Sequence, residues 1–225
     1  MRAPAVWLLV GSLAGFPAAD AGVAAFQTSS SQRHGRLFPP EDLGMLEVPD
    51  RRAWQKPEHV MDVLNIAEGA VVADVGAGAG WFTIHLARRV GPNGLVYAVD
   101  VQAEMIEAIS RRVRRERLAN VKTVRGSGSM PNLLPSGSLD AVLVVDAYQE
   151  VDEDERVMFL RNLGAALKPN GRLGIVNHKP GRGGPGPEPE VRIDSAVVEE
   201  KAREAGLRVV ARENLPYQYM LVLGK

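Results

Sequence analysis

The chain of 225 residues contains no cysteine and no excess of either charge, and both absences narrow what it can be. Without cysteine there is no disulfide framework, no thiolate metal ligand and no cysteine nucleophile. The 27 basic residues are balanced by 27 acidic residues, which argues against a dedicated nucleic-acid-binding protein, because such proteins usually carry a basic excess. The length suits one domain with a sizeable core.

The chain also lacks a long apolar run. Its uncharged N-terminal stretch, residues 5–13, is too short to span a bilayer as a stable helix. Arg2 precedes this stretch and the small residues Ala19 and Ala21 follow it, which is the layout of a secretory signal with its cleavage site. We therefore expect a signal peptide over residues 1–21 and an exported, periplasmic bacterial protein, with no stable membrane span beyond an uncleaved signal. The alternative is an N-terminal extension or a mis-assigned start, which would leave the protein cytoplasmic.

The remainder of the chain divides into an irregular segment and a regular one. Residues 22–53 are polar, rich in serine and proline and without sustained periodicity, so we interpret them as a linker and an N-terminal arm. Residues 54–225 form the predicted domain. Its apolar runs, typical of buried strands, are residues 71–75, 95–100, 121–125, 139–145, 172–177, 207–212 and 218–223. Its helical stripes are residues 57–67, 81–90, 103–118, 152–167 and 194–205.

Strands that alternate with helices predict a parallel sheet with helices on both faces. The last two strands break this alternation, because residues 213–217 are too few to form a crossover. The last strand should therefore run antiparallel to its neighbour. The predicted fold is α/β: a Rossmann-like, doubly wound sheet of seven strands, mostly parallel, with an antiparallel last strand.

The most informative stretch is VVADVGAGAGW, residues 71–81, in which an apolar strand runs into Gly76, Gly78 and Gly80. In an open α/β sheet, ligands bind outside the carboxyl ends of the strands, and glycines let a ligand contact the loop backbone. A dinucleotide-binding loop has the spacing G-x-G-x-x-G, but here the third glycine comes one residue early. Asp74, two residues before the first glycine, suits a ligand with a cationic part better than a pyrophosphate.

This loop resembles the first motif of the class I S-adenosylmethionine-dependent methyltransferases, an acidic residue followed by x-G-x-G-x-G, matched by Asp74, Gly76, Gly78 and Gly80. The cofactor that the resemblance implies, S-adenosylmethionine, carries a sulfonium, an ammonium and a carboxylate but no phosphate. In this family an acid at the end of the second strand binds the ribose hydroxyls, and Asp100 matches it. A carboxylate that accepts two hydroxyl donors is a good chemical fit.

The resemblance covers roughly residues 54–225 and includes LKPNGRLGIV, residues 167–176, at the turn into the fifth strand. Within the family, the chain most resembles the small-molecule branch that contains the ubiquinone and menaquinone C-methyltransferases. By this resemblance Ala77 belongs to the cofactor loop and Val101 packs on the adenine.

The chain departs from that branch after the third strand. There the branch usually has Gly-Asp-Ala, whose aspartate bonds the adenine amino group. This sequence has RGSGSM, residues 125–130, so Ser127 and Ser129 are the candidates for that bond. A hydroxyl is a weaker anchor than a carboxylate, and the resemblance therefore implies a weakened adenine contact.

Candidate catalytic side chains follow the fourth and fifth strands. Methyl transfer requires alignment and desolvation of the acceptor, and a general base only where the acceptor must lose a proton. We predict that Asp146 faces the methionine end of the cofactor and that Tyr148 or Glu150 faces the acceptor; Glu150 is alternatively an acid at a helix start, favoured by the helix dipole. His178 is a candidate base at neutral pH or, equally, a hydrogen-bonded histidine at a strand end. Residues 180–190, rich in glycine and proline, are either a lid over the substrate or a flexible crossover.

The other charged residues do not define a further site. Histidines and acids are too scattered to predict a metal site, and the arginines within residues 111–117 spread around a helix as a solvated face. The leading interpretation is a methyltransferase that acts on carbon, oxygen or nitrogen of a small-molecule acceptor, with no nucleic-acid partner. A non-catalytic relic that binds S-adenosylmethionine or another nucleoside is the alternative. A nicotinamide oxidoreductase fits the glycine spacing less well, and arsenite methylation is disfavoured because no cysteine is available to hold arsenic.

Overall fold

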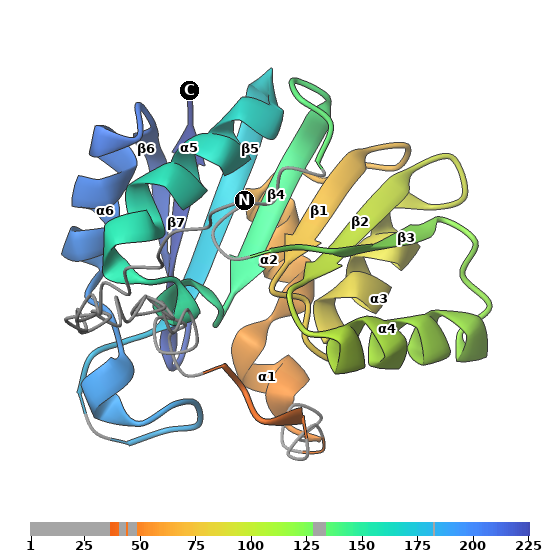
Figure 1. Ribbon diagram of the computed structural model, residues 1–225, viewed down its shortest axis with the longest axis horizontal. Helices are drawn as coiled ribbons and strands as arrows, with labels where there is room; N and C mark the ends of the chain where they lie inside the picture. Colours follow the sequence, from red (N-terminus) through yellow and green to blue (C-terminus); the bar gives the residue numbers. More distant parts are fainter. Residues whose placement is uncertain (1–36, 41–43, 45–48, 128–133, 182) are drawn as a thin grey trace, which may run out of the picture. The chain divides into compact units, whose positions relative to one another are not determined.

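Seven strands form one sheet in the order β3-β2-β1-β4-β5-β7-β6 (Figure 1). The computed structural model describes residues 37–40, 44, 49–127, 134–181 and 183–225. The strands are β1 (Val71–Val75), β2 (Leu95–Asp100), β3 (Val121–Arg125), β4 (Leu139–Val145), β5 (Leu167–His178), β6 (Arg208–Asn214) and β7 (Gln218–Gly224). All neighbouring strands pair in parallel except β7, which is antiparallel to both β5 and β6. The predicted sheet, mostly parallel with an antiparallel last strand, is confirmed.

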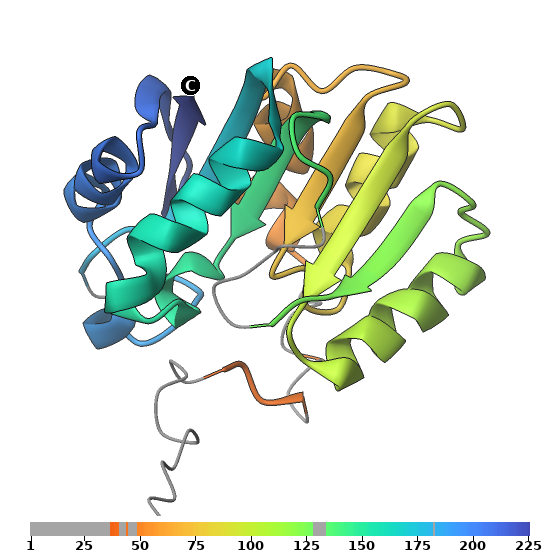
Figure 2. The same cartoon turned by 45° about the horizontal axis from the view of Figure 1, so that its top comes forward.

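Helices cover both faces of the sheet. They are α1 (Arg51–Gln55), α2 (Pro57–Val63), α3 (Trp81–Val90), α4 (Ala103–Arg115), α5 (Arg156–Ala166) and α6 (Ser195–Glu204), with the 3-10 turns η3 (Tyr148–Glu150), η4 (Glu153–Glu155) and η5 (Pro189–Val191). One core cluster joins the sheet to α5 and α6, and a second joins it to α2 and α3. Figures 1 and 2 show α5 in front of β5, while α3 lies behind β1 and β2.

The strand β4 illustrates why the central sequence runs are apolar at successive positions. Val142 and Val144 belong to the core cluster on the α5 and α6 side, whereas Leu143 and Val145 belong to the cluster on the α2 and α3 side. Because successive side chains of a strand point to opposite faces, a strand covered on both faces needs apolar residues at every position.

Several predicted bounds differ from the structure: the helix predicted over residues 57–67 ends at Val63, the helix predicted over 103–118 ends at Arg115, and the helix predicted over 152–167 begins at Arg156. The sequence predicted a turn over residues 168–171 and a strand from residue 172, but β5 already begins at Leu167. The register between β4 and β5 shifts at Leu139 and Ala141, and this irregularity accommodates the turn residues within the strand. The helix α1 crosses the predicted boundary between the irregular arm, residues 22–53, and the domain that begins at residue 54.

The carboxyl ends of β1, β2, β4 and β5 meet at one edge of the sheet, and α1 lies at this edge (Figure 1). This is where an open α/β sheet binds its ligands. Within the described residues, none of the helices combines the length and apolar character needed to cross a membrane. The predicted signal peptide, residues 1–21, lies outside the described residues.

Candidate functional site

The glycine loop after β1 folds back over the end of β2. The backbone amides of Gly76 and Ala77 both donate to the carbonyl oxygen of Val99, at 2.9 and 3.0 Å. Gly76 has a φ of 71°, and a Cβ atom there would lie 2.3 Å from the Cβ of Ala147, which follows β4. Gly76 is therefore glycine because the loop passes too close to the neighbouring strand end for any side chain. Gly80 is the N-cap residue of α3.

The loop fixes Asp100 at the end of β2. The Oδ2 atom accepts a hydrogen bond from the Gly78 amide at 2.9 Å, and Oδ1 accepts one from the Gln102 amide at 3.0 Å. Asp100 is 7% exposed; burial raises the pKa of its carboxyl, while the bonds from Gln102 and Gly78 lower it. Each carboxylate oxygen keeps a further lone pair. Asp100 is thus an oriented acceptor for two more donors, such as the adjacent hydroxyls of a sugar.

Asp74 lies beneath this loop. Its carboxylate accepts a hydrogen bond of 2.6 Å from Thr83 Oγ1 in α3, and the residue is 2% exposed. Burial raises the pKa of Asp74 to about 6, against the lowering effects of the Thr83 hydrogen bond and the charge of Arg51. The prediction that Asp74 contacts the ligand stays a prediction; in the structure it supports the start of α3 and contributes charge from behind the loop.

Glu150 adds a third carboxyl group near this edge. From the sequence it was either a residue that faces the acceptor, as an alternative to Tyr148, or an acid at a helix start. Burial, together with the charges of Asp100 and Asp146, raises the pKa of Glu150 to about 8. Its carboxyl group is therefore within electrostatic reach of both the Asp100 and the Asp146 ends of the site. Carboxylates gathered in this way favour a ligand that carries positive charge.

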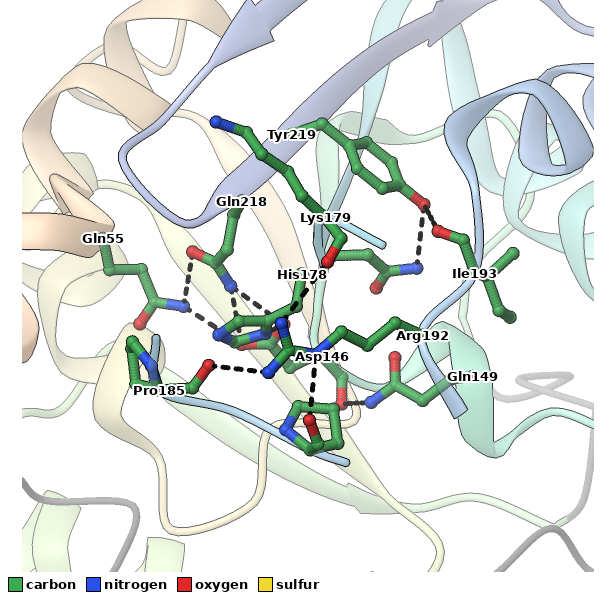
Figure 3. Close-up of polar contacts among 12 residues, drawn as sticks. Gln55, Asp146, Gln149, His178, Lys179, Pro185, Arg192, Ile193, Gln218 and Tyr219 are labelled. Carbon is green, nitrogen blue, oxygen red and sulfur yellow. Dashed lines mark hydrogen bonds and ion pairs between the residues drawn. The ribbon is translucent and has the colours of Figure 1, made fainter. Parts of the chain in front are cut away.

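Figure 3 shows the second half of the site, a polar cluster around Asp146 at the end of β4. The Nδ1 atom of His178 lies 2.8 Å from Asp146 Oδ1. Gln218 of β7 donates to both carboxylate oxygens, at 2.8 and 2.7 Å, and Gln55 of α1 donates to Oδ2 at 3.3 Å. Asp146 has a φ of 52°, a left-handed conformation that is uncommon outside glycine and is often found at functional sites. Asp146 and His178, both candidates from the sequence, thus form one hydrogen-bonded pair.

The other nitrogen of His178 is buried without a partner. His178 is 3% exposed, and among the described residues none bonds its Nε2 atom. The ring of Trp54 lies 5.8 Å away between centroids. Gly186 passes so close that a Cβ atom there would lie 2.4 Å from Nε2. A buried polar atom without a partner is uncommon in a folded protein and points to a group kept for function.

The segment that covers His178 is held by one guanidinium group. Arg192 donates hydrogen bonds to the carbonyl oxygens of Lys179, Gly181, Gly183, Pro185 and Pro187. Figure 3 shows the bonds to Lys179 and Pro185. We refer to residues 183–190 as the covering segment. Its backbone is organised around Arg192 rather than around a secondary-structure ladder, so this side chain determines where the segment lies.

Tyr148 lies away from the His178 pair. Its side chain is fully buried, 6.3 Å from the Phe159 ring and 5.6 Å from the guanidinium carbon of Arg156. Burial raises the pKa of the Tyr148 hydroxyl to about 12. The sequence predicted that Tyr148 faces the acceptor, but η3 directs it into the core next to α5. Its catalytic role is a prediction that none of these contacts supports, and we do not propose it further.

The residues predicted to bind adenine are described only in part. Val101 is half-buried next to Asp100, and Ser127 is exposed after β3. Ser129 lies outside the described residues. The Nε2 atom of Gln102 donates to the carbonyl oxygen of Phe38 at 3.0 Å, so Phe38 lies on this side of the sheet. The roles of Val101, Ser127 and Ser129 stay predictions.

Sequence reasoning missed two side chains of the site, Gln55 and Gln218. Gln55 comes from α1, a helix that was not predicted. Gln218 is fully buried at the start of an otherwise apolar strand, and a polar residue in that position was the signal available. For metals, the part of the chain that the structure describes contains no group of three or more histidines and acids able to hold an ion.

Comparisons with known proteins identify the class. A family model described as a methyltransferase domain matches residues 72–171. Over 138 residues the chain is 38% identical to the tRNA (guanine-N(7)-)-methyltransferase of Thermus thermophilus, which covers 57% of this chain and 43% of that protein. Over 123 residues it is 31% identical to the demethylmenaquinone methyltransferase of a Geobacillus species, covering 55% and 51%. The chain therefore spans about half the length of these curated relatives.

Among solved structures, the chain is similar to a SAM-dependent methyltransferase from Aquifex aeolicus. The two share 30% sequence identity with a TM-score of 0.77, over 83% of this chain and 98% of that one. The chain belongs to the class I S-adenosylmethionine-dependent methyltransferases, as its first motif predicted. The relatives named here are all named as methyltransferases, so the comparisons do not favour a non-catalytic relic.

The residues present fit the cofactor of this family. S-adenosylmethionine has two ribose hydroxyls and a sulfonium cation. Asp100 offers two oriented carboxylate oxygens for the hydroxyls. Glu150 lies near both Asp100 and Asp146, and a cation bound there would favour its ionised form. The donor and acceptor chemistry of this edge is therefore suited to the cofactor.

Proposed function

We propose that the chain binds S-adenosylmethionine at the edge formed by the glycine loop and Asp100, and that it methylates a small-molecule acceptor. The bound cofactor supplies an electrophilic methyl group on a sulfonium. In this proposal Asp100 accepts hydrogen bonds from the ribose, and the loop of Gly76 to Gly80 presents backbone to the cofactor. Asp146 lies where the methionine end of the cofactor meets the acceptor.

The observation that carries the proposal is the fixed carboxylate of Asp100. Its two oxygens are oriented by the Gly78 and Gln102 amides at 2.9 and 3.0 Å, so the side chain is already arranged before a ligand arrives. Preorganisation of this kind strengthens binding, because the ordering cost is not part of the binding step. The adjacent hydrogen-bonded pair of Asp146 and His178 supports the acceptor side of the proposal.

Calorimetric titration with S-adenosylmethionine and with S-adenosylhomocysteine tests the cofactor half. We expect both to bind to the wild-type chain. Asp100→Ala should weaken binding about tenfold or more, because charge-assisted hydrogen bonds contribute roughly 1.5–3 kcal/mol. The matched control is Glu107→Ala, which removes one negative charge from the exposed face of α4.

The control variant should bind both ligands with unchanged affinity. An unchanged affinity in Asp100→Ala, with the fold intact by circular dichroism, would exclude this site. Transfer of a labelled methyl group from S-adenosylmethionine to compounds of a bacterial lysate then tests turnover. Label that appears only in nucleic acid or protein would contradict a small-molecule acceptor.

A further inference from the structure

We propose that His178 is the general base of this site and that the methyl acceptor is an aromatic hydroxyl compound, whose proton is taken by His178 Nε2. The inference rests on the proposed function, because it names the acceptor of the same site.

The hydrogen bond to Asp146 sets which nitrogen of His178 is basic. A carboxylate only accepts hydrogen bonds, so the Nδ1 atom at 2.8 Å from Oδ1 carries the proton in the neutral imidazole. Gln218 donates to both oxygens of the same carboxylate, which prevents the carboxylate from turning away. The lone pair of His178 is therefore on Nε2, and the negative Asp146 stabilises the imidazolium that forms when Nε2 takes a proton.

The environment of the free Nε2 atom suits a hydrogen-bond acceptor whose donor is supplied by a ligand. It is buried and unpartnered among the described residues, and leaving a buried acceptor unsatisfied costs free energy. The indole Nε1 of Trp54, whose ring is 5.8 Å from the imidazole, is a second buried atom without a partner in the described part of the chain. The His178 Nε2 atom is an acceptor, and the Trp54 Nε1 atom is a donor. A hydroxyl group can satisfy both kinds of atom at once, whereas an ammonium group can only donate.

The surroundings of the pair indicate a flat acceptor. Trp54 stacks edge-on with Tyr217 at 6.0 Å between centroids, so three rings with His178 lie next to one another. The covering segment rests on two of them through glycines: a Cβ atom at Gly184 would lie 2.6 Å from Tyr217, and one at Gly186 would lie 2.4 Å from His178. An aromatic ring that takes the place of the Gly184 and Gly186 backbone would contact aromatic side chains, and contacts between aromatic rings are favourable.

The charged side chains around His178 come from several elements of the fold. Asp146 faces it from the end of β4, and Glu150 of η3 lies near Asp146. Lys179, next in the chain, donates to the carbonyl oxygens of Leu215 and Pro216. Arg192 donates to backbone carbonyl oxygens around the covering segment (Figure 3).

The reaction transfers a methyl group to the acceptor oxygen and a proton to His178. A lone pair of the acceptor oxygen forms the new bond to the methyl carbon, and the bond from that carbon to the sulfonium sulfur breaks with its electron pair left on sulfur. The hydroxyl proton moves to His178 Nε2, and the resulting imidazolium later returns it to water. The acceptor reaches Nε2 by displacing Gly186, so the hydrogen bonds of Arg192 determine how often the base is open.

The first experiment uses 4-nitrophenol as the probe, because its phenolate absorbs at a longer wavelength than the phenol. At a pH where the free phenol is mostly protonated, we expect the wild-type chain to bind it with a phenolate band. His178→Gln should lose this band, and the control His59→Gln, on the exposed face of α2, should keep it. 4-Nitroanisole, which has no proton to give, should produce no band. A wild-type chain without the band, or a His178→Gln variant that keeps it, would overturn the proposal.

A second experiment does not depend on the acceptor. Diethyl pyrocarbonate modifies unprotonated imidazole, and peptide mass spectrometry locates the product. We expect His178 to react slowly in the wild-type chain and roughly tenfold or more faster in Arg192→Ala, because the loss of even one net hydrogen bond shifts an opening equilibrium by about that factor. His59 is the internal reference and should react equally in both. An unchanged rate at His178 would contradict the role given to the covering segment and Gly186.

Failure of this inference can be separated from failure of the proposed function. Calorimetry with S-adenosylhomocysteine on His178→Gln should give the wild-type affinity, because His178 lies at the acceptor end. If the cofactor binds normally while the phenolate band is absent from the wild-type chain, only the inference about the acceptor fails. If the cofactor does not bind to the wild-type chain, the proposed function fails, whatever the spectra show.

Discussion

The Gly78 amide and the Asp100 carboxylate are joined by a hydrogen bond of 2.9 Å across 22 residues of sequence. Gly78 has a φ of 53°, a left-handed conformation that glycine adopts without strain. The bond makes the glycine loop and the end of β2 one structural unit. The first motif of the family and the acid after the second strand are therefore coupled physically, and a change in either should disturb the other.

The close approach of the loop to β4 can be measured with two glycine substitutions. Gly76→Ala introduces a Cβ atom 2.3 Å from Ala147 Cβ, whereas Gly69→Ala places one in open space at a similar φ of 79°. Both variants share the backbone penalty of a positive φ. Gly76→Ala should lower the free energy of unfolding by roughly 1–3 kcal/mol more than Gly69→Ala, because only it overpacks its site. Equal losses of unfolding free energy in urea denaturation would show that the loop shifts to accommodate the added Cβ atom without a free-energy penalty.

Asp74 should make the chain less stable as the pH rises. Its pKa is raised to about 6 in the folded protein from 3.8, so the folded state binds the proton more tightly than the unfolded state. The associated stability is present below about pH 4 and is lost as the pH rises through 6, by on the order of 3 kcal/mol. Asp74→Asn keeps an oxygen for the Thr83 hydroxyl and has no charge. From pH 4 to pH 7 the unfolding free energy of the variant should rise relative to that of the wild type. A difference that stays constant over this range would contradict the raised pKa of Asp74.

Glu150 should couple cofactor affinity to pH. Its pKa of about 8 means that it is largely protonated at neutral pH, and a nearby cation favours the ionised form. Binding of S-adenosylmethionine should therefore release protons at pH 7 and strengthen as the pH approaches 8. Calorimetry in buffers of different ionisation enthalpy counts these protons.

Glu150→Gln is the control for that titration, because the ammonium group of the ligand also titrates near pH 8. Proton release should be smaller in the variant than in the wild type at the same pH. The same release in both proteins would show that Glu150 does not sense the ligand.

The predicted signal peptide can be tested independently of the site. Arg2, the apolar residues 5–13 and the small residues before Gly22 predict export and cleavage after Ala21. Expressed with its own N-terminus in a Gram-negative host, the protein should be found in the periplasmic fraction with Gly22 as its first residue by mass spectrometry. A cytoplasmic product that retains Met1 would contradict this prediction.

Much of the sheet follows from the sequence because buried parallel strands leave a strong pattern. The strands β1, β2, β3 and β4 have the bounds that their apolar runs predicted. Candidate catalytic side chains were predicted after the fourth and fifth strands, and Asp146 and His178 lie together because these strands are parallel neighbours. The helix predicted over residues 194–205 also begins where expected: Asp194 is the N-cap residue of α6, and its side chain accepts from the Ala196 amide at 2.8 Å.

The parts that were not predicted depend on contacts between distant residues. Gln55 and Gln218 reach Asp146 across 91 and 72 residues, and neither belongs to a periodic pattern or a known spacing. Tyr148 was expected to face the acceptor because it follows β4, but the 3-10 turn η3 rotates it into the core. The direction of a side chain in such a turn depends on packing against α5, which a single sequence does not specify.

The most direct test of the central claim is a crystal structure of the chain with S-adenosylhomocysteine. Our account predicts that both ribose hydroxyls lie within hydrogen-bond distance of the Asp100 carboxylate, while Gly78 and Gln102 keep their bonds to it. A ligand bound elsewhere, or a ribose that contacts other residues while Asp100 bonds only Gly78 and Gln102, would contradict the account.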